Sequence, residues 1–89
     1  MTKLIYSHKF IEDAGSVREA IKRQEIKRQT DALAEFPLMG TPGIPASISR
    51  TFGPQVRMLV VNPFNVVYEY DEKTDVVMLL GLVHQSRAW

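Results

Sequence analysis

The sequence contains no cysteine, one tryptophan and two histidines among its 89 residues. The absence of cysteine excludes disulfides, thiolate zinc sites and a cysteine nucleophile, and it fits a reducing compartment. Long apolar runs are also missing. The longest, Val76–Val83, is far too short to span a membrane, and the N-terminus lacks a signal-peptide pattern. We therefore expect no membrane partner and a cytoplasmic location.

The chain has no strong net charge either, because its eleven Lys and Arg residues are nearly balanced by ten Asp and Glu residues. A net charge of +1 gives no reason to expect nucleic acid as a partner of the whole molecule. Residues 1–28 carry seven cationic and four acidic side chains, whereas residues 29–89 carry four and six. The hydrophobic content of 45% is that of a globular protein, and the length predicts a single domain over residues 1–89.

The first third of the chain predicts a short strand followed by helical structure. Lys3–Tyr6 is apolar enough for an edge strand. Apolar residues then recur at helical spacing and form one stripe, composed of Phe10, Ala14, Val17 and Ile21. Gly15 interrupts this region, and Ser16 with Glu19 has the spacing of a capping box. The pattern leaves open whether one helix contains Gly15 or a second helix begins at Ser16.

A second break is predicted near Gln24, because the tetrapeptide that begins at Ile21 recurs five residues later at Ile26. Five residues rotate a helix by about 140° beyond a full turn, so the two isoleucines cannot share a face. Either the helix bends near Gln24, or a new helix packs through a stripe formed by Ile26, Thr30 and Leu33. We expect the helical region to end near Glu35, because Pro37 disfavours helical conformation at the residue before it.

The rest of the chain predicts a loop and then β-structure. Residues 37–54 hold four prolines and three glycines, and Ala46–Phe52 within them is compatible with a short strand. Three later segments are rich in β-branched and aromatic residues and are separated by short turns: Val56–Val61, Phe64–Tyr70 and Val76–His84. The last is apolar on both faces and is expected to be central. The predicted fold is α+β, with an N-terminal strand and helical segments packed on one face of a small antiparallel β-meander.

Three segments together resemble the RelE/ParE toxin superfamily. The helix-ending segment Glu35-Phe36-Pro37-Leu38-Met39-Gly40 resembles the "FP-x-x-G" segment of that superfamily. Residues 53–68 are similar to its "R-x-L-V-x-x-x-Y-x-I-x-Y" hairpin, and the ending His84-Gln85-Ser86-Arg87 is similar to its "H-x-x-R" ending. The chain departs from typical members in a shorter helical hairpin, in Phe64 where many have Tyr, and in ending two residues after Arg87.

The resemblance implies a small toxin that is neutralised by a cognate antitoxin. It implies a hetero-oligomer with that antitoxin, contact with DNA only through the antitoxin, and neither cofactor nor metal. ParE-like members inhibit DNA gyrase, whereas RelE-like members cleave messenger RNA on the ribosome without a metal. Our preferred interpretation is a ParE-like gyrase inhibitor. The alternatives are a RelE-like endoribonuclease and an inactive relative that binds only its antitoxin.

Candidate site residues also follow from the resemblance. If the chain is a nuclease, Arg57, Tyr68, His84 and Arg87 match positions that carry catalytic groups in the RNA-cleaving branch, and three of them lie on strands that plausibly pair. Structural roles compete with this interpretation, since Arg57 can pair with Glu69, Tyr68 can belong to the core, and His84 can be a hydrogen-bonded structural histidine. If the chain is a gyrase inhibitor, the target-binding candidates are Arg87 and Trp89.

Overall fold

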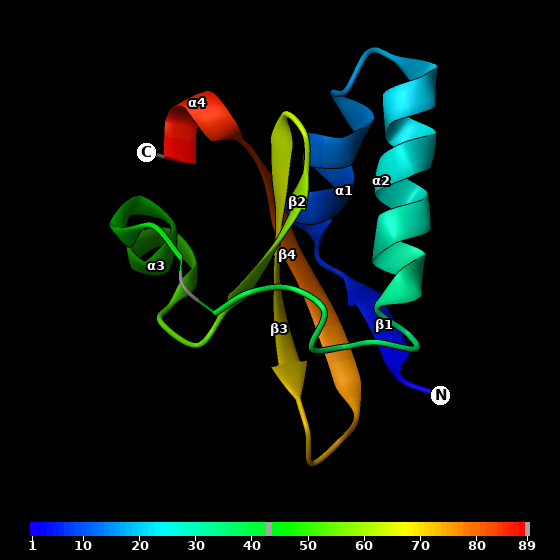
Figure 1. The fold of residues 1–89 in the computed structure, drawn as a ribbon, viewed down its shortest axis with the longest axis vertical. Helices are drawn as coiled ribbons and strands as arrows, with labels where there is room; N and C mark the ends of the chain where they lie inside the picture. Colours follow the sequence, from blue (N-terminus) through cyan, green and yellow to red (C-terminus); the bar gives the residue numbers. More distant parts are fainter. Residues whose placement is uncertain (43, 89) are drawn as a thin grey trace.

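The computed structural model describes residues 1–42 and 44–88, which form four strands and four helices (Figure 1). The strands are β1 (Lys3–Tyr6), β2 (Arg57–Val61), β3 (Phe64–Asp71) and β4 (Val76–His84). The helices are α1 (His8–Gly15), α2 (Ala20–Ala32), α3 (Ala46–Phe52) and α4 (Gln85–Ala88). The structure is thus the α+β arrangement that the sequence predicts, with an N-terminal strand, a helical segment and then the remaining strands.

The four strands form one sheet in the order β1-β4-β3-β2. Strands β2, β3 and β4 are consecutive antiparallel neighbours, and β4 lies between β1 and β3, as predicted for a strand that is apolar on both faces. The predicted antiparallel meander of β2, β3 and β4 is confirmed, and because β1 pairs in parallel with β4 the whole sheet is mixed. Strand periodicity records which face a residue occupies but not the direction of a partner strand, so it did not predict the direction of β1.

Helices α1 and α2 pack on one face of the sheet, as predicted for residues 10–35, and α3 covers part of the other face (Figure 1). The expectation of a strand at Ala46–Phe52 is therefore wrong. The backbone N–H groups of Ile48 and Ser49 donate to the Pro45 carbonyl, and Gly53 ends the helix at a φ of 101°. Ile48 and Phe52, one helical turn apart, both pack on the sheet, whereas Arg50 between them is exposed.

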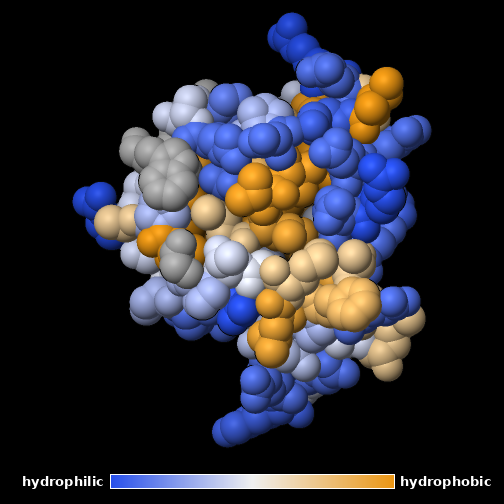
Figure 2. Space-filling model, viewed as in Figure 1, coloured by the Kyte–Doolittle hydropathy of each residue, from blue (hydrophilic) through white to orange (hydrophobic). Residues whose placement is uncertain are grey.

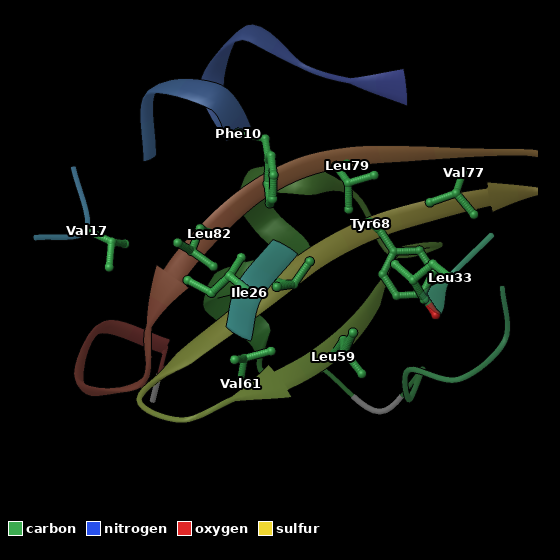
Figure 3. Close-up of a cluster of buried hydrophobic side chains, with 11 residues drawn as sticks. Phe10, Val17, Ile26, Leu33, Leu59, Val61, Tyr68, Val77, Leu79 and Leu82 are labelled. Carbon is green, nitrogen blue, oxygen red and sulfur yellow. The ribbon is translucent and has the colours of Figure 1, made fainter. Parts of the chain in front are cut away.

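The main core lies between the sheet and the α1–α2 pair (Figure 3). Its buried side chains come from both helices, from the segment that joins them and from three strands: Phe10, Val17, Ile26, Leu33, Leu59, Val61, Val66, Tyr68, Val77, Leu79 and Leu82. A smaller cluster under α3 contains Ile48, Val56, Met58 and Val67. Side chains of β3 alternate between the two clusters, since Val66 and Tyr68 face the first and Val67 faces the second.

The helical region consists of two helices rather than one. α1 ends at Gly15, and the Ser16 hydroxyl donates to the Asp13 carbonyl at 2.7 Å, so Ser16 ends the first helix instead of capping the second. α2 runs without a break past Gln24, and it ends at Ala32 with turns continuing to Glu35.

The second stripe, formed by Ile26, Thr30 and Leu33, is buried as predicted. Ile21, by contrast, is 79% exposed and does not belong to the first stripe. The break predicted near Gln24 is therefore wrong, because α2 begins at Ala20 and continues through Gln24; only the predicted change of packing face, to the stripe that contains Ile26, is confirmed.

One irregularity in β4 determines where its last residues point. Val67 pairs with Gly81, but the next residue, Tyr68, pairs with Leu79, so Leu80 is an extra residue in β4. A bulge of this kind reverses the alternation of side chains beyond it. Leu79 and Leu82 therefore both face α1 and α2, while Leu80 packs under α3.

Candidate functional site

Tyr68 is one of two candidate residues that lie directly opposite each other, since β3 pairs Tyr68 with Arg57 of β2. Tyr68 has no exposed surface. Its hydroxyl donates to the Pro37 carbonyl at 2.8 Å and accepts from the Gly40 N–H at 2.9 Å. Both bonding capacities of the hydroxyl are thus used within the protein, to hold the loop that follows α2.

Arg57 holds the same loop from the neighbouring strand. Its Nη2 atom donates to the Gly40 carbonyl at 2.8 Å and to the Leu38 carbonyl at 3.2 Å, and Nε donates to the Gly40 carbonyl at 3.1 Å. Arg57 does not pair with Glu69, whose carboxylate accepts from the Gln55 side chain at 3.3 Å. The guanidinium group therefore serves backbone carbonyls of the loop rather than the cross-strand carboxylate that the sequence suggested.

His84 lies at the other end of β3, opposite Phe64, and its ring contacts the Phe64 ring edge-on at 5.4 Å. The Ser86 N–H donates to His84 Nδ1 at 3.1 Å, and the Ser86 hydroxyl lies 2.8 Å from the same atom. Phe64 is four residues from Tyr68 along β3, which corresponds to about 13 Å. The structure therefore brings Arg57 and Tyr68 together but does not bring His84 to them.

The two remaining candidates lie near the C-terminus. Arg87 belongs to α4, directly after the strand that ends at His84. Trp89 lies outside the described residues. Within residues 1–42 and 44–88, no group of three or more His, Asp or Glu side chains is arranged to hold a metal ion, and no helix there is long and apolar enough to cross a membrane.

Sequence reasoning missed the role of Asp13 at the edge of β4. β1 pairs only with the first half of β4, and beyond it the Asp13 carboxylate accepts from the Leu82 N–H at 3.1 Å. Lys9 forms an ion pair with Asp13 at 3.2 Å, and the Ser7 hydroxyl donates to the Leu80 carbonyl at 3.1 Å. Side chains of α1 and its N-cap thus occupy a strand edge that would otherwise be open to another strand. No periodicity in the sequence indicates this contact.

The loop that Arg57 and Tyr68 hold presents apolar side chains to solvent, and sequence reasoning did not treat it as a site. Phe36 is 61% exposed, Leu38 53% and Met39 38%. Figure 2 shows apolar side chains gathered over the loop that follows α2 and continuing over β2. We call residues 36–39 the apolar ridge. The available signal was a run of three apolar side chains, Phe36, Leu38 and Met39, around Pro37 in a segment expected to be a loop.

The ridge forms one wall of a shallow groove of about 670 Å³, and the other wall is the end of β3. The lining residues are Glu35, Phe36, Pro37, Leu38, Met39, Tyr70 and Glu72.

The Tyr70 hydroxyl donates to Asp75 Oδ1 at 2.8 Å, and Thr2 donates to the same oxygen at 2.7 Å. The hydrogen bonds from Thr2 and then Tyr70 hold the pKa of the Asp75 carboxyl below its ordinary value. The hydrogen bond to Asp75 raises the pKa of Tyr70 in turn.

Solved structures with this fold define its class. The chain is similar to a chain of the intact E. coli RelBE toxin–antitoxin complex, with a TM-score of 0.71 and 12% identity over 94% of this chain and 96% of that one. It is similar to a chain of the RelBE2 toxin–antitoxin complex of Mycobacterium tuberculosis, with a TM-score of 0.70 and 15% identity over 93% and 96%. The chain is also similar to a chain of the archaeal RelE–RelB complex from Pyrococcus horikoshii OT3, with a TM-score of 0.69 and 15% identity over 98% of each chain. The chain therefore shares its fold with these chains of toxin–antitoxin complexes.

The family follows from the sequence itself. Residues 4–89 match the family model described as the ParE toxin of the type II toxin–antitoxin system parDE, so the chain belongs to the ParE toxin family. It is accordingly the toxin component of a type II toxin–antitoxin module. No curated protein matches the chain in the corresponding sequence comparison. The resemblance to the RelE/ParE toxin superfamily, which rested on three short segments of the sequence, is confirmed.

Proposed function

We propose that this toxin inhibits DNA gyrase by binding it, without cleaving RNA, and that a cognate antitoxin neutralises it in a hetero-oligomeric complex. Its contact with DNA is made through that antitoxin. The family match supports the ParE-like branch, and the structural neighbours, all taken from toxin–antitoxin complexes, support the antitoxin.

The observation that carries the proposal is the engagement of Tyr68 and Arg57. Metal-free cleavage of RNA needs a base for the 2′-hydroxyl, an acid for the leaving oxygen and cations at the scissile phosphate. The hydroxyl of Tyr68 is buried and bonded twice, and Arg57 is bonded to two loop carbonyls. The Tyr68 hydroxyl is not available for that chemistry while the loop keeps its position, and Nε and Nη2 of Arg57 are already bonded to loop carbonyls. The near-neutral net charge of +1 also favours a protein target over a ribosomal surface.

A second candidate function is the RelE-like endoribonuclease, favoured by the surroundings of His84. This histidine is exposed, its Nδ1 is engaged by Ser86, and α4 with Arg87 follows it directly. An engaged Nδ1 leaves Nε2 as the ring atom that can reach a substrate. On this hypothesis the catalytic centre lies at the C-terminal end of β4, far from Tyr68.

The two functions are distinguished by what happens first when the toxin is expressed. We expect a pulse of expression to arrest growth, to change the supercoiling of a reporter plasmid, and to leave messenger RNA intact. Co-expression of the neighbouring reading frame, tested as the antitoxin, restores growth and supercoiling together. Rapid cleavage of translated messenger RNA with unchanged supercoiling would overturn the gyrase proposal in favour of the nuclease.

A further inference from the structure

The groove beside the apolar ridge combines exposed apolar side chains with two carboxylates. We propose that it receives a segment of the antitoxin that carries a bulky apolar side chain with a Lys or Arg close to it in sequence. This inference rests on the proposed function in that the antitoxin is the partner. It goes beyond that function in naming the surface of the toxin and the side chains that the surface recognises.

The groove is formed before any partner arrives. Five hydrogen bonds fix the backbone between Pro37 and Gly40: Tyr68 donates one and accepts one, and Arg57 donates two from Nη2 and one from Nε. On the opposite wall the hydroxyl of Tyr70 is fixed by Asp75. A surface held in this way loses little conformational freedom when it binds, which favours affinity.

The hydrogen bonds of Tyr68 and Arg57 hold a loop whose apolar side chains point outward. Phe36, Leu38 and Met39 are the exposed members of the ridge, and Pro37 is half-buried between them. The buried Tyr68 and the half-buried Arg57 hold the loop so that this surface faces solvent. Contiguous exposed apolar surface of this kind marks interaction sites. The partner must therefore supply apolar side chains of its own.

The rim of the groove is negatively charged. Glu35 and Glu72 lie at this rim, and both are exposed. Within residues 1–42 and 44–88, all four ion pairs lie in α1 and α2, so neither rim carboxylate has a cationic partner. The rim is complementary to Lys or Arg and repels phosphate groups. A partner that presents a nucleic-acid backbone is thereby disfavoured, which leaves a protein. Of the two protein partners in the proposed function we assign the groove to the antitoxin, because the structural neighbours come from toxin–antitoxin complexes.

The test measures the affinity of the folded toxin for the purified product of the neighbouring reading frame. The variant Leu38→Ser/Met39→Ser removes two exposed apolar side chains of the ridge, and Ile11→Ser/Ile21→Ser, at positions 57% and 79% exposed on α1 and α2, is its matched control. We expect the ridge variant to bind at least about 10-fold more weakly, as for the loss of a hot spot, and the control to lose much less. Unchanged circular dichroism and melting temperature establish that both variants are folded.

A second pair of variants tests the charge argument separately. Glu35→Lys/Glu72→Lys reverses the rim, and Glu12→Lys/Glu19→Lys makes the same change of net charge in the helical half. We expect only the rim variant to weaken binding at low salt and to reduce its salt dependence. Equal affinity of the wild type and both groove variants would overturn the inference while the proposed function stands.

Two further outcomes are also decisive. Loss of growth arrest with antitoxin binding intact would assign the groove to the target and overturn the inference. A wild-type toxin that does not bind the neighbouring product at all would instead remove the antitoxin from the proposed function, and the inference with it.

Discussion

Gly40 lies against Tyr68 so closely that a Cβ atom at Gly40 would be 2.8 Å from both Cε1 and Oη of the tyrosine. The same Cβ would be 2.9 Å from the backbone oxygen of Met58. The tyrosine hydroxyl accepts the Gly40 N–H at 2.9 Å, so close approach and hydrogen bond occur together. The glycine of the "FP-x-x-G" segment is therefore explained by contact with the sheet.

Gly40→Ala is expected to destabilise the protein by about 1–3 kcal/mol, the usual cost of forcing an extra carbon into a packed site. Gly15→Ala is the matched control, because a Cβ there meets nothing within 4 Å and Gly15 is the last residue of α1. We expect the control to be neutral or slightly stabilising, by up to ~1 kcal/mol. Urea unfolding of both variants measures the difference, and equal stability of the two would contradict the close contact.

Tyr68→Phe removes one hydroxyl and leaves the buried Gly40 N–H and the Pro37 carbonyl without their partner. Leaving a buried polar group unpaired costs ~1–3 kcal/mol. Tyr70→Phe is the comparison, since its hydroxyl bonds the carboxylate of Asp75, which is exposed. We expect the Tyr68 variant to lower the urea midpoint clearly more than the Tyr70 variant. A Tyr68→Phe protein as stable as the wild type would show that the hydroxyl does not hold the loop.

The sequence predicted what depends on local periodicity. The three strands after the Pro- and Gly-rich loop, the edge strand Lys3–Tyr6 and the buried stripe at Ile26 all follow from which side chains repeat at two or at three to four residues. The parallel direction of β1 and the helical state of Ala46–Phe52 do not follow, because they depend on where the chain enters the sheet and on which face remains to be covered.

The candidate site was harder to predict for a related reason. Arg57 and Tyr68 were identified as residues of interest, but their bonds go to backbone atoms of a loop about twenty to thirty residues earlier, and backbone atoms leave no mark in a sequence pattern. The position of His84 relative to Tyr68 depends on the register between β3 and β4, including the extra residue at Leu80. Register is a tertiary property, so no spacing along the chain could establish that His84 lies apart from Arg57 and Tyr68.

The stability of the protein should depend on pH in the acidic range through Asp75. Hydrogen bonds from Thr2 and Tyr70 hold the pKa of the Asp75 carboxyl below its ordinary value. A group with a lowered folded-state pKa contributes stability that is complete above its unfolded pKa, about 3.9 for Asp, and that is lost as the pH falls through the folded pKa. We therefore expect the stabilising contribution of the charged carboxylate to begin to decline at about pH 4 and to be lost as the pH falls further, through the lower folded-state pKa.

Asp75→Asn isolates this contribution, because asparagine tolerates the positive φ of 54° at this position and keeps an oxygen acceptor. Urea midpoints of the wild type and the variant should differ most near pH 7 and converge toward pH 3. A difference that is constant over this range would show that Asp75 does not titrate differently in the folded and unfolded states.

The last prediction separates gyrase inhibition from RNA cleavage through residues at opposite ends of β3. If the toxin inhibits gyrase, His84→Gln should arrest growth nearly as well as the wild type, because the ring contacts Phe64 and Ser86 and has no chemical step to perform. Arg57→Ala should reduce arrest only as far as it lowers the amount of folded protein, since it releases the carbonyls of Leu38 and Gly40. Trp89→Ala should weaken binding to the target. If the toxin is a nuclease, removal of a general acid or base at His84 costs ~10²–10⁴ in rate, and arrest is lost in a folded protein. Growth is measured together with soluble toxin and antitoxin binding. A folded His84→Gln protein that no longer arrests growth, beside a wild type that cleaves translated messenger RNA, would contradict gyrase inhibition and place the active centre at the end of β4.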